Sequence, residues 1–173
     1  NCTMINCLIY NSSGTALSAG IYKTNGNTYH CTVCNCALSG DTTGISGLSQ
    51  TGGTTKNCIV WGCHPASSTA GSVKVSDGTF ANGVTEKDVG TDTATGDPKF
   101  VNAAAGDFRI ATATSPACEH GVPLASVPLD IVGNVRSETA PTAGAYEFAG
   151  EFVGIPANPP FKYATGETLT ADI

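Results

Sequence analysis

Two stretches of the chain, SAGIYKTNGNTYHC (residues 18–31) and ISGLSQTGGTTKNC (residues 45–58), align without a gap and place Cys31 on Cys58. A partial third copy ends at Cys7, so that MINCLIYN, TYHCTVCN and TKNCIVWG align on cysteines that are 24 and 27 residues apart. Repeats of about 20 to 50 residues are typical of solenoids, in which each repeat buries its apolar face only against the next one. The alignment therefore predicts a stack of similar coils.

The residue types indicate that each coil is made of strands. Charged residues are only 13% of the 173-residue chain, Gly occurs 21 times, and the aligned segments combine Gly and Asn turns with β-branched runs. This pattern favours short strands joined by tight turns. We predict an all-β fold: a right-handed parallel β-helix of about three coils plus an irregular C-terminal cap that contains a short helix, in residues 1–148. Residues 149–173, which include several prolines, are predicted to be a linker or extended tail.

Strand alternation divides the aligned columns into an inner and an outer set. The inner columns hold small or branched apolar groups: Cys7, Cys31 and Cys58, then Ile9, Val33 and Val60. The outer columns are Leu8, Thr32 and Ile59, then Tyr10, Cys34 and Trp61. Asn11 and Asn35 follow the strands, where an Asn ladder would satisfy backbone groups at a bend. We therefore predict a buried cysteine ladder of Cys7, Cys31 and Cys58.

The cysteine-rich stretch NTYHCTVCNC (residues 27–36) has the spacing of a metal clamp, but its geometry argues against one. Cys31 and Cys34 are three residues apart, so on an extended strand they point to opposite faces and cannot share a tetrahedral ion. We therefore predict no metal site. Cys36 aligns with Cys63 one coil later, and neighbouring coils are separated by about 4.8 Å, which suits a disulfide. An inter-coil bridge between these two cysteines is a hypothesis.

Four later motifs carry a resemblance to a known family. They read DPKFVNAAAGDFRI (97–110), SPACEHG (115–121), PLDIVGNVR (128–136) and AGAYEF (143–148). Together with the NCLIYN, AGIY and NCIVWG segments, they resemble the C-terminal region of bacterial secreted right-handed parallel β-helix repeat proteins, the group often labelled choice-of-anchor proteins. Three positions depart from the usual pattern of that group: Cys118, Glu119 and Thr142. The resemblance implies an extracellular or cell-surface location.

The later motifs also predict how the fold is capped. Ser115 can cap the N-terminus of a short helix that has Pro116 at its first position and Gly121 just beyond its end. Several bulky apolar groups are expected to cover the last coil, because a terminal coil would otherwise expose apolar surface and strand edges. These groups are Phe100, Phe108, Ile110 and Tyr146.

The sequence offers little chemistry for catalysis. The resembled group includes polysaccharide lyases and hydrolases, which gather carboxylates in one place. Residues 1–63 contain a single acid, Asp41, beside Lys23 and Lys56, and the remaining acids are spread singly along the tail. The three histidines are isolated, and we interpret them as surface or turn residues. We predict no catalytic residue and no cofactor.

Charge and cysteine content limit the partners and the compartment. The net charge of −6 argues against nucleic acid as a partner, because binding to phosphates depends on Lys and Arg. No apolar run reaches the length of about 18 residues that a transmembrane helix needs. Eight cysteines suggest an oxidising, extracellular compartment.

The preferred functional hypothesis is a non-catalytic surface or adhesive module. Its first coil, which begins without a cap, is expected to dock on another β-helix segment or on a copy of itself, giving an oligomer or filament. One alternative is the cap of a polysaccharide lyase or hydrolase whose catalytic coils lie upstream. Another is a glycan-binding module that uses outward aromatic residues, Tyr10 and Trp61 with Tyr22 on a neighbouring face. A covering loop from residues 37–57 or 64–96 would remove that face.

Overall fold

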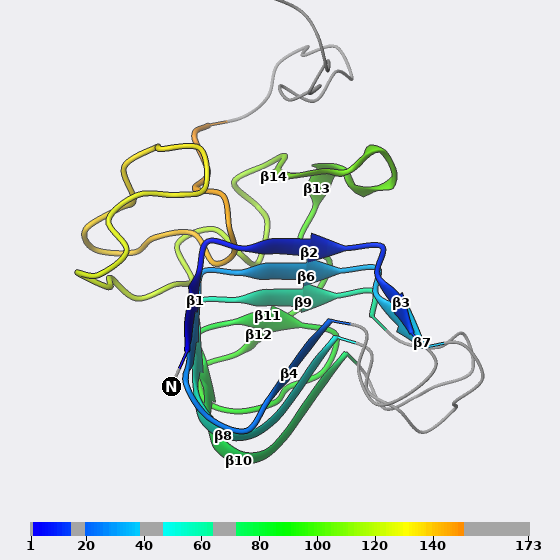
Figure 1. The fold of residues 1–173 in the computed structure, drawn as a ribbon. Coiled ribbons are helices and arrows are strands. Elements are labelled where there is room, and N and C mark those ends of the chain that lie inside the picture. Colours follow the sequence, from blue (N-terminus) through cyan, green and yellow to red (C-terminus); the bar gives the residue numbers. More distant parts are fainter. Residues whose placement is uncertain (1, 15–19, 39–46, 64–71, 151–173) are drawn as a thin grey trace, which may run out of the picture.

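The computed structural model describes residues 2–14, 20–38, 47–63 and 72–150 (Figure 1). The prediction of an all-β fold with parallel sheets is confirmed for these residues: the two largest sheets are parallel throughout, and the only described helix is a single 3-10 turn. The predicted tail beyond Gly150 lies outside the described residues. Among the described residues, no helix has the length and apolar character needed to cross a membrane.

The chain winds repeatedly through the same two sheets, and we call each such turn of the chain a pass. The first large sheet, called sheet B, contains one short strand from each successive pass. Its strand order is β12-β11-β9-β6-β2, and every pair is parallel. The register joins Leu8 to Thr32 and Thr32 to Ile59, the partners of the cysteine-based alignment. The strands are β2 (Leu8–Tyr10), β6 (Thr32–Cys34), β9 (Ile59–Trp61), β11 (Val84–Thr85) and β12 (Ala94–Thr95).

The second large sheet, sheet A, lies across a sharp corner from sheet B and curves strongly (Figure 1). Its order is β1-β5-β8-β10, and a further strand, β4, pairs with the first part of β8. A small parallel pair, β3 (Ser13–Gly14) with β7 (Ala37–Leu38), follows sheet B. The strands of sheet A are β1 (Thr3–Ile5), β4 (Ile21–Lys23), β5 (Asn27–Tyr29), β8 (Leu48–Lys56) and β10 (Val73–Ala81).

Each pass therefore runs through sheet A, a corner and sheet B. The described passes are residues 2–14, 20–38, 47–63 and 72–85, and β12 adds one more strand to sheet B. The fourth pass exceeds the expected three. The sequence signal of the fourth pass is the spacing of Gly78 and Asn82, which matches the spacing of Gly53 and Asn57. However, Gly83 stands where the earlier passes have a cysteine.

The corner between the sheets requires a left-handed residue in every pass. Asn6, His30, Asn57 and Asn82 have φ values of 51°, 49°, 55° and 52°. Asn, His and Asp are the residues other than Gly that adopt this conformation most readily. The backbone N–H of each corner residue donates to a carbonyl of the next pass, at 3.0–3.1 Å. The repeated corner therefore fixes the register of both sheets.

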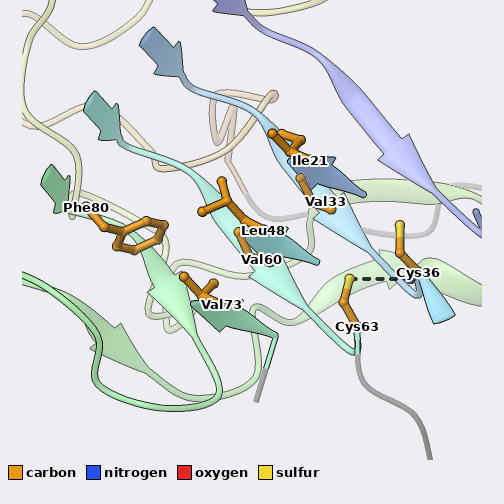
Figure 2. Packing of buried hydrophobic residues seen from close by; sticks show 8 residues of the cluster. All are labelled: Ile21, Val33, Cys36, Leu48, Val60, Cys63, Val73 and Phe80. Atoms are coloured by element: carbon orange, nitrogen blue, oxygen red, sulfur yellow. Dashed lines mark hydrogen bonds between the residues drawn. The ribbon is translucent and has the colours of Figure 1, made fainter. Parts of the chain in front are cut away.

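A first core fills the space between the sheets (Figure 2). Val33 and Val60 of sheet B point into it and meet Ile21 and Leu48 of sheet A. Phe80, only 2% exposed, closes the fourth pass. The apolar columns of successive passes stack on one another, so the core is continuous through the passes.

The C-terminal region covers the opposite, outer face of sheet B. It begins with β13 (Phe100–Asn102), the 3-10 turn η1 (Ala103–Ala105) and β14 (Asp107–Ile110), where β13 and β14 pair antiparallel. Ile59 and Val84 point outward from sheet B into a second core that includes Ile110, Ala117 and Ala143. Phe108 extends this cover as far as the first pass, where its ring lies 4.9 Å from that of Tyr10. The region thus lies along the whole sheet and is not only a cap on the last pass.

The predicted helix from Ser115 to Gly121 is wrong, since these residues form turns. Ser115 Oγ does accept from the N–H of Ala117 at 3.1 Å, as a helix cap would, but it also donates to the carbonyl of Pro98 at 2.6 Å. The chain turns once, through a bond from Cys118 N to the Ser115 carbonyl, and then extends. Two contacts take precedence over helix formation: Ala117 packs against Ile59 and Val84 of sheet B, and its carbonyl accepts from Ala143 N at 2.9 Å.

Gly53 and Gly133 allow a paired test of the close packing between passes. Both have left-handed backbones, with φ of 80° and 90°, but a Cβ at Gly53 would lie 2.1 Å from the carbonyl oxygen of Gly26, whereas one at Gly133 would meet nothing within 4 Å. Gly133→Ala should reduce the free energy of unfolding by about 1–2 kcal/mol through backbone strain alone. Gly53→Ala should reduce it by more than about 4 kcal/mol, the range of severe overpacking. Urea denaturation of both variants measures the difference, and equal losses would contradict the packing of the passes.

Candidate functional site

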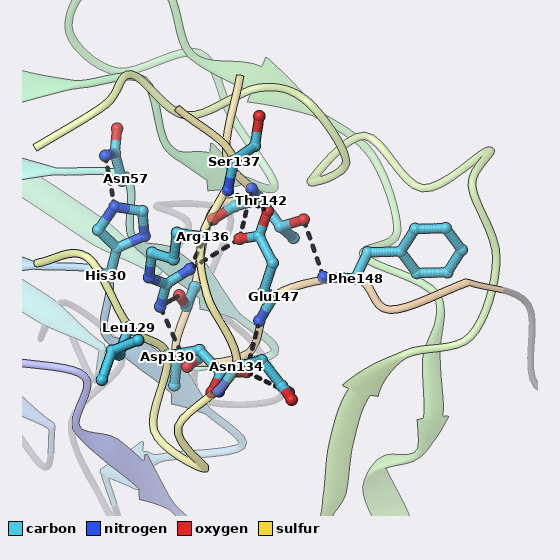
Figure 3. A network of polar contacts seen from close by, with 12 residues as sticks. His30, Asn57, Leu129, Asp130, Asn134, Arg136, Ser137, Thr142, Glu147 and Phe148 are labelled. Atoms are coloured by element: carbon cyan, nitrogen blue, oxygen red, sulfur yellow. Dashed lines mark hydrogen bonds and ion pairs between the residues drawn. The ribbon is translucent and has the colours of Figure 1, made fainter. Parts of the chain in front are cut away.

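The most polar interior site lies where the C-terminal region meets the corner (Figure 3). Arg136 is buried there at 5% exposure. Its guanidinium donates to the Glu147 carboxylate at 3.1 Å, to Asn6 Oδ1 at 2.9 Å and to the carbonyls of Thr142, Gly144 and Ala145 at 3.0–3.2 Å. Burial is the main cause that lowers the pKa of Arg136, and the charge of Glu147 opposes this effect. The arginine is therefore held in place by both a counter-charge and backbone carbonyls.

Asp130 organises the hairpin that leads to Arg136. Its carboxylate accepts from the N–H groups of Val132 and Asn134 at 2.9 and 2.8 Å and from Glu147 N at 3.0 Å. Leu129 and Val135 form an antiparallel bridge across the hairpin. With Asp130 itself only 5% exposed, the carboxylate is used in holding the backbone and has a structural role.

His30 lies in this network, contrary to its interpretation as a surface or turn histidine. It does occupy a turn, but its side chain is fully buried. Its Nε2 lies 2.8 Å from Asn57 Nδ2, and Asn57 also bonds both backbone groups of Val122, at 2.7 and 3.0 Å. Burial, together with the charge of Arg136, lowers the pKa of His30 from 6.5 to about 3. The imidazole is neutral near pH 7 and accepts the Asn57 hydrogen bond.

A cleft of about 350 Å³ opens beside this network. Its walls are mostly apolar, and its polar lining comes from His30, Arg136, Ser137 and Glu138. The size lies within the range of small-ligand sites. However, a histidine with a pKa of about 3 cannot act as a general base or acid near pH 7, and Arg136 is already paired. These two residues of the cleft are therefore used in holding the fold.

Other charged groups are also engaged locally. Asp107 pairs with Arg109, which lowers the pKa of the aspartate, and Arg109 donates to both carboxylate oxygens. Within the ranges that the structure describes, no three His, Cys, Asp or Glu side chains gather as metal ligands. Among the described acids, Asp107 and Glu147 thus contact arginines, and Asp130 holds backbone N–H groups.

The predicted ligand face on sheet B is largely covered. Cys34 is buried, and Trp61 is half-buried beside the second core. Tyr10 remains 43% exposed, although its ring contacts Phe108. Among the described residues, the C-terminal region supplies most of this cover, and Glu86, from the 64–96 region, accepts from Gly62 N at the end of β9. Tyr22, on β4, is 56% exposed and lies on the separate surface of sheet A.

The cysteines follow the passes. The N–H of Cys7 donates to Cys31 Sγ and the N–H of Cys31 to Cys58 Sγ, each at 3.4 Å, so the three lie one above another. The hydrogen bond with Cys58 and burial raise the pKa of Cys31, which makes it an inert packing group. In the same way, Cys36 N donates to Cys63 Sγ at 3.3 Å (Figure 2). Both of these thiols are free and fully buried in this structure.

One side of the first pass has no strand beside it among the described residues. In each later pass, the first sheet B residue donates its N–H to a carbonyl of the preceding pass at 2.9 Å, as Thr32, Ile59, Val84 and Ala94 do. Leu8 is the equivalent residue of the first pass, and no described carbonyl accepts from its N–H. The Ile5 carbonyl is the equivalent of the Tyr29 and Lys56 carbonyls in the later passes. Those two carbonyls accept from the corner residue of the preceding pass. The Leu8 N–H and the Ile5 carbonyl, whose described partner is the Cys7 thiol at 3.5 Å, mark a candidate interface, the N-terminal edge, which consists of β1 and β2.

Sequence reasoning missed the polar network completely. Asp130, Arg136 and Glu147 lie near one another in the sequence but far from Asn57, and their spacing has no recognisable pattern. The motifs PLDIVGNVR and AGAYEF, which contain the first three, were recognised only through the resemblance. A signal that could have been used is the column formed by Asn6, His30 and Asn57, which immediately precede the aligned cysteines.

Comparisons with family models, curated proteins and solved structures find no match to this chain. The functional interpretation therefore depends on the geometry of the described residues.

The hypothesis of a Cys36–Cys63 disulfide can be tested by mass. A hydrogen bond from the Cys63 thiol lowers the pKa of Cys36, which favours the thiolate that attacks an oxidant. Refolding in a glutathione redox buffer should yield a species that has lost two hydrogens, seen by intact mass spectrometry and peptide mapping. Cys63→Ser should abolish this species, whereas Cys58→Ser should not. A fully reduced chain under these conditions would refute the bridge.

The burial of neutral His30 predicts a specific pH dependence of stability. Its pKa is about 3 in the folded protein and 6.5 ordinarily, so between these values the unfolded chain binds a proton that the folded chain does not. The free energy of unfolding should therefore fall as the pH falls, by about 2 kcal/mol from this residue between pH 7 and pH 5.

The variant His30→Asn keeps a residue suited to the left-handed corner but cannot titrate. Urea denaturation at pH 5 and pH 7 should show a smaller loss of stability on acidification for the variant than for the natural chain, even if the variant is less stable at both pH values. Equal losses would show that His30 does not titrate as its burial implies.

Proposed function

We propose that this chain is a non-catalytic, extracellular surface or adhesive module with the fold of a right-handed parallel β-helix, whose N-terminal edge binds a further β-helix coil. The passes correspond to the coils of the β-helix. The observation that carries the proposal is that the Leu8 N–H and the Ile5 carbonyl face no described strand, at positions where every later coil is bonded to its neighbour. Such an edge is a template for another strand.

The two ends of the stack differ in a way that supports this role. The strands Thr3–Ile5 and Leu8–Tyr10 contain no charged residue. At the other end, β10 contains Lys74 and Asp77 and has two register shifts along its pairing with β8. Charges and bulges on an edge strand discourage further pairing. The asymmetry favours docking at the N-terminal edge over the opposite end.

A purely structural use of the polar groups supports the non-catalytic part of the proposal. Arg136, Asp130 and His30 are all engaged within the polar network, and the carboxylates of Glu147 and Asp107 face arginines. Release of reducing or unsaturated ends from polyuronates or other glycans by this chain alone would contradict it. The glycan-binding alternative is weakened because Cys34 is buried and Trp61 is half-buried in the outer column.

Solution association tests the N-terminal edge. Sedimentation velocity at several concentrations should show reversible association of the 173-residue chain. Leu8→Pro should weaken this association, because proline removes an N–H that points away from β6 and is tolerated at the first residue of an edge strand. Leu8→Ala retains that N–H and is the matched control. A chain that stays monomeric at every concentration, or equal effects of the two variants, would count against docking of a copy at this edge.

A further inference from the structure

An unusual concentration of exposed apolar side chains lies beside the N-terminal edge. Five of the seven exposed large apolar residues of the described chain are Ile5 and four members of one hairpin. The hairpin residues are Leu129, Ile131, Val132 and Val135, with exposures of 44%, 38%, 43% and 73%. We call residues 129–135 the apolar hairpin. Exposed apolar side chains gathered in one short segment indicate an interaction site.

The contacts of the C-terminal region show where this hairpin points. At its start, Val122 bonds Asn57, the corner residue of the third pass. Seven residues later, the carbonyl of Leu129 accepts from Asn6 Nδ2 at 2.7 Å, at the corner of the first pass. The segment from Val122 to Leu129 therefore runs along the corner from the third pass to the first and leads into the apolar hairpin. A coil added to the N-terminal edge would have its corner beside this hairpin.

The hairpin is held rigidly in place. Asp130 accepts two backbone N–H groups within it, Asp130 N donates to the Asn134 carbonyl at 2.8 Å, and Arg136 N donates to the Pro128 carbonyl at 2.9 Å. Arg136 also joins Asn6 through its side chain at 2.9 Å. Since the turn is fixed by buried charged groups while its apolar side chains remain exposed, folding of the described chain does not account for those apolar side chains.

We propose that the apolar hairpin is a second contact for the coil that docks on the N-terminal edge. The edge would bind the backbone of the incoming coil, and the hairpin would bind its corner. This inference rests on the proposed function. The chemistry of the partner follows: a parallel β-strand coil with a left-handed Asn, His, Asp or Gly at the corner facing Asn6, an apolar inward residue above Met4, and uncharged side chains next to the hairpin.

The inference can be tested by adding such a coil to the chain itself. In the extended chain, a copy of residues 27–52 replaces Asn1 and is joined directly to Cys2. The copy supplies one additional pass, because Cys2 occupies the same position in its pass as residue 53, which follows residue 52 in the natural chain. The register supports this junction, since Thr3 pairs with Asn27 and Asn27 with Thr54. The midpoint temperature of thermal unfolding is then measured for the natural and extended chains, each with and without Val132→Ser and Val135→Ser.

The extended chain should have a higher midpoint temperature than the natural chain. The serine pair should lower the midpoint of the extended chain by about 2–4 °C, the size expected for loss of a small apolar contact in a chain of this length, and leave the natural chain unchanged. Lys74→Ser, which shortens an exposed side chain on β10 at the opposite end of the stack, is the control and should affect both chains alike. In NMR spectra, the amide resonances of Gly133 and Asn134 should shift when the coil is added.

The remaining outcomes separate the two proposals. If the added coil raises the midpoint equally with and without the serine pair, and the hairpin amides do not shift, the hairpin contact is refuted while the N-terminal edge remains a docking site. If the added coil gives no increase, docking at the edge itself is refuted. If the serine pair lowers both chains equally, the hairpin is only part of the fold and this inference is overturned.

Discussion

One backbone constraint governs the structure: each pass must turn between sheet A and sheet B at a residue with a left-handed conformation. Asn6, His30, Asn57 and Asn82 meet this requirement with nearly identical φ values. Their N–H groups bond forward to the next pass, while the first residue of sheet B bonds back to the preceding pass. A shift of register by one residue would move every apolar column to the opposite face. The corner thus determines both the hydrogen bonding and the composition of the two cores.

The same corner determines where the C-terminal region attaches. Asn57 bonds Val122 with its amide and accepts Gly144 N with its carbonyl, and Thr32 Oγ1 accepts from Ala145 N at 3.0 Å. Arg136 then links Asn6 to three carbonyls and to Glu147. Because a buried charge is stable only when it is fully paired, the arginine depends on the passes as much as the passes depend on their cover. The two parts should therefore unfold together.

The sequence was informative about the passes and uninformative about their cover. The cysteine-aligned segments predicted parallel strands, and alternation separated Val33 and Val60 from Ile59 and Trp61, which indeed belong to different cores. The fourth pass was missed because Gly83 replaces the aligned cysteine, although Gly78 and Asn82 keep their places. The route of residues 97–148 along sheet B, the turn at Ser115 and the burial of His30 could not be predicted, because each arises from contacts between residues far apart in the chain.

Burial on both faces of sheet B also explains why its side chains are poor candidates for ligand binding. Parallel sheets are usually covered on both sides, and here the first core and the second core provide that cover. Charged groups of the C-terminal region are used to hold its irregular backbone against the corner. The N-terminal edge, by contrast, presents backbone groups that face no described strand, and the adjacent hairpin presents exposed apolar side chains. Recognition through these features would depend on the pattern of a partner coil, with a left-handed corner residue and an apolar inward residue, more than on any single charged contact.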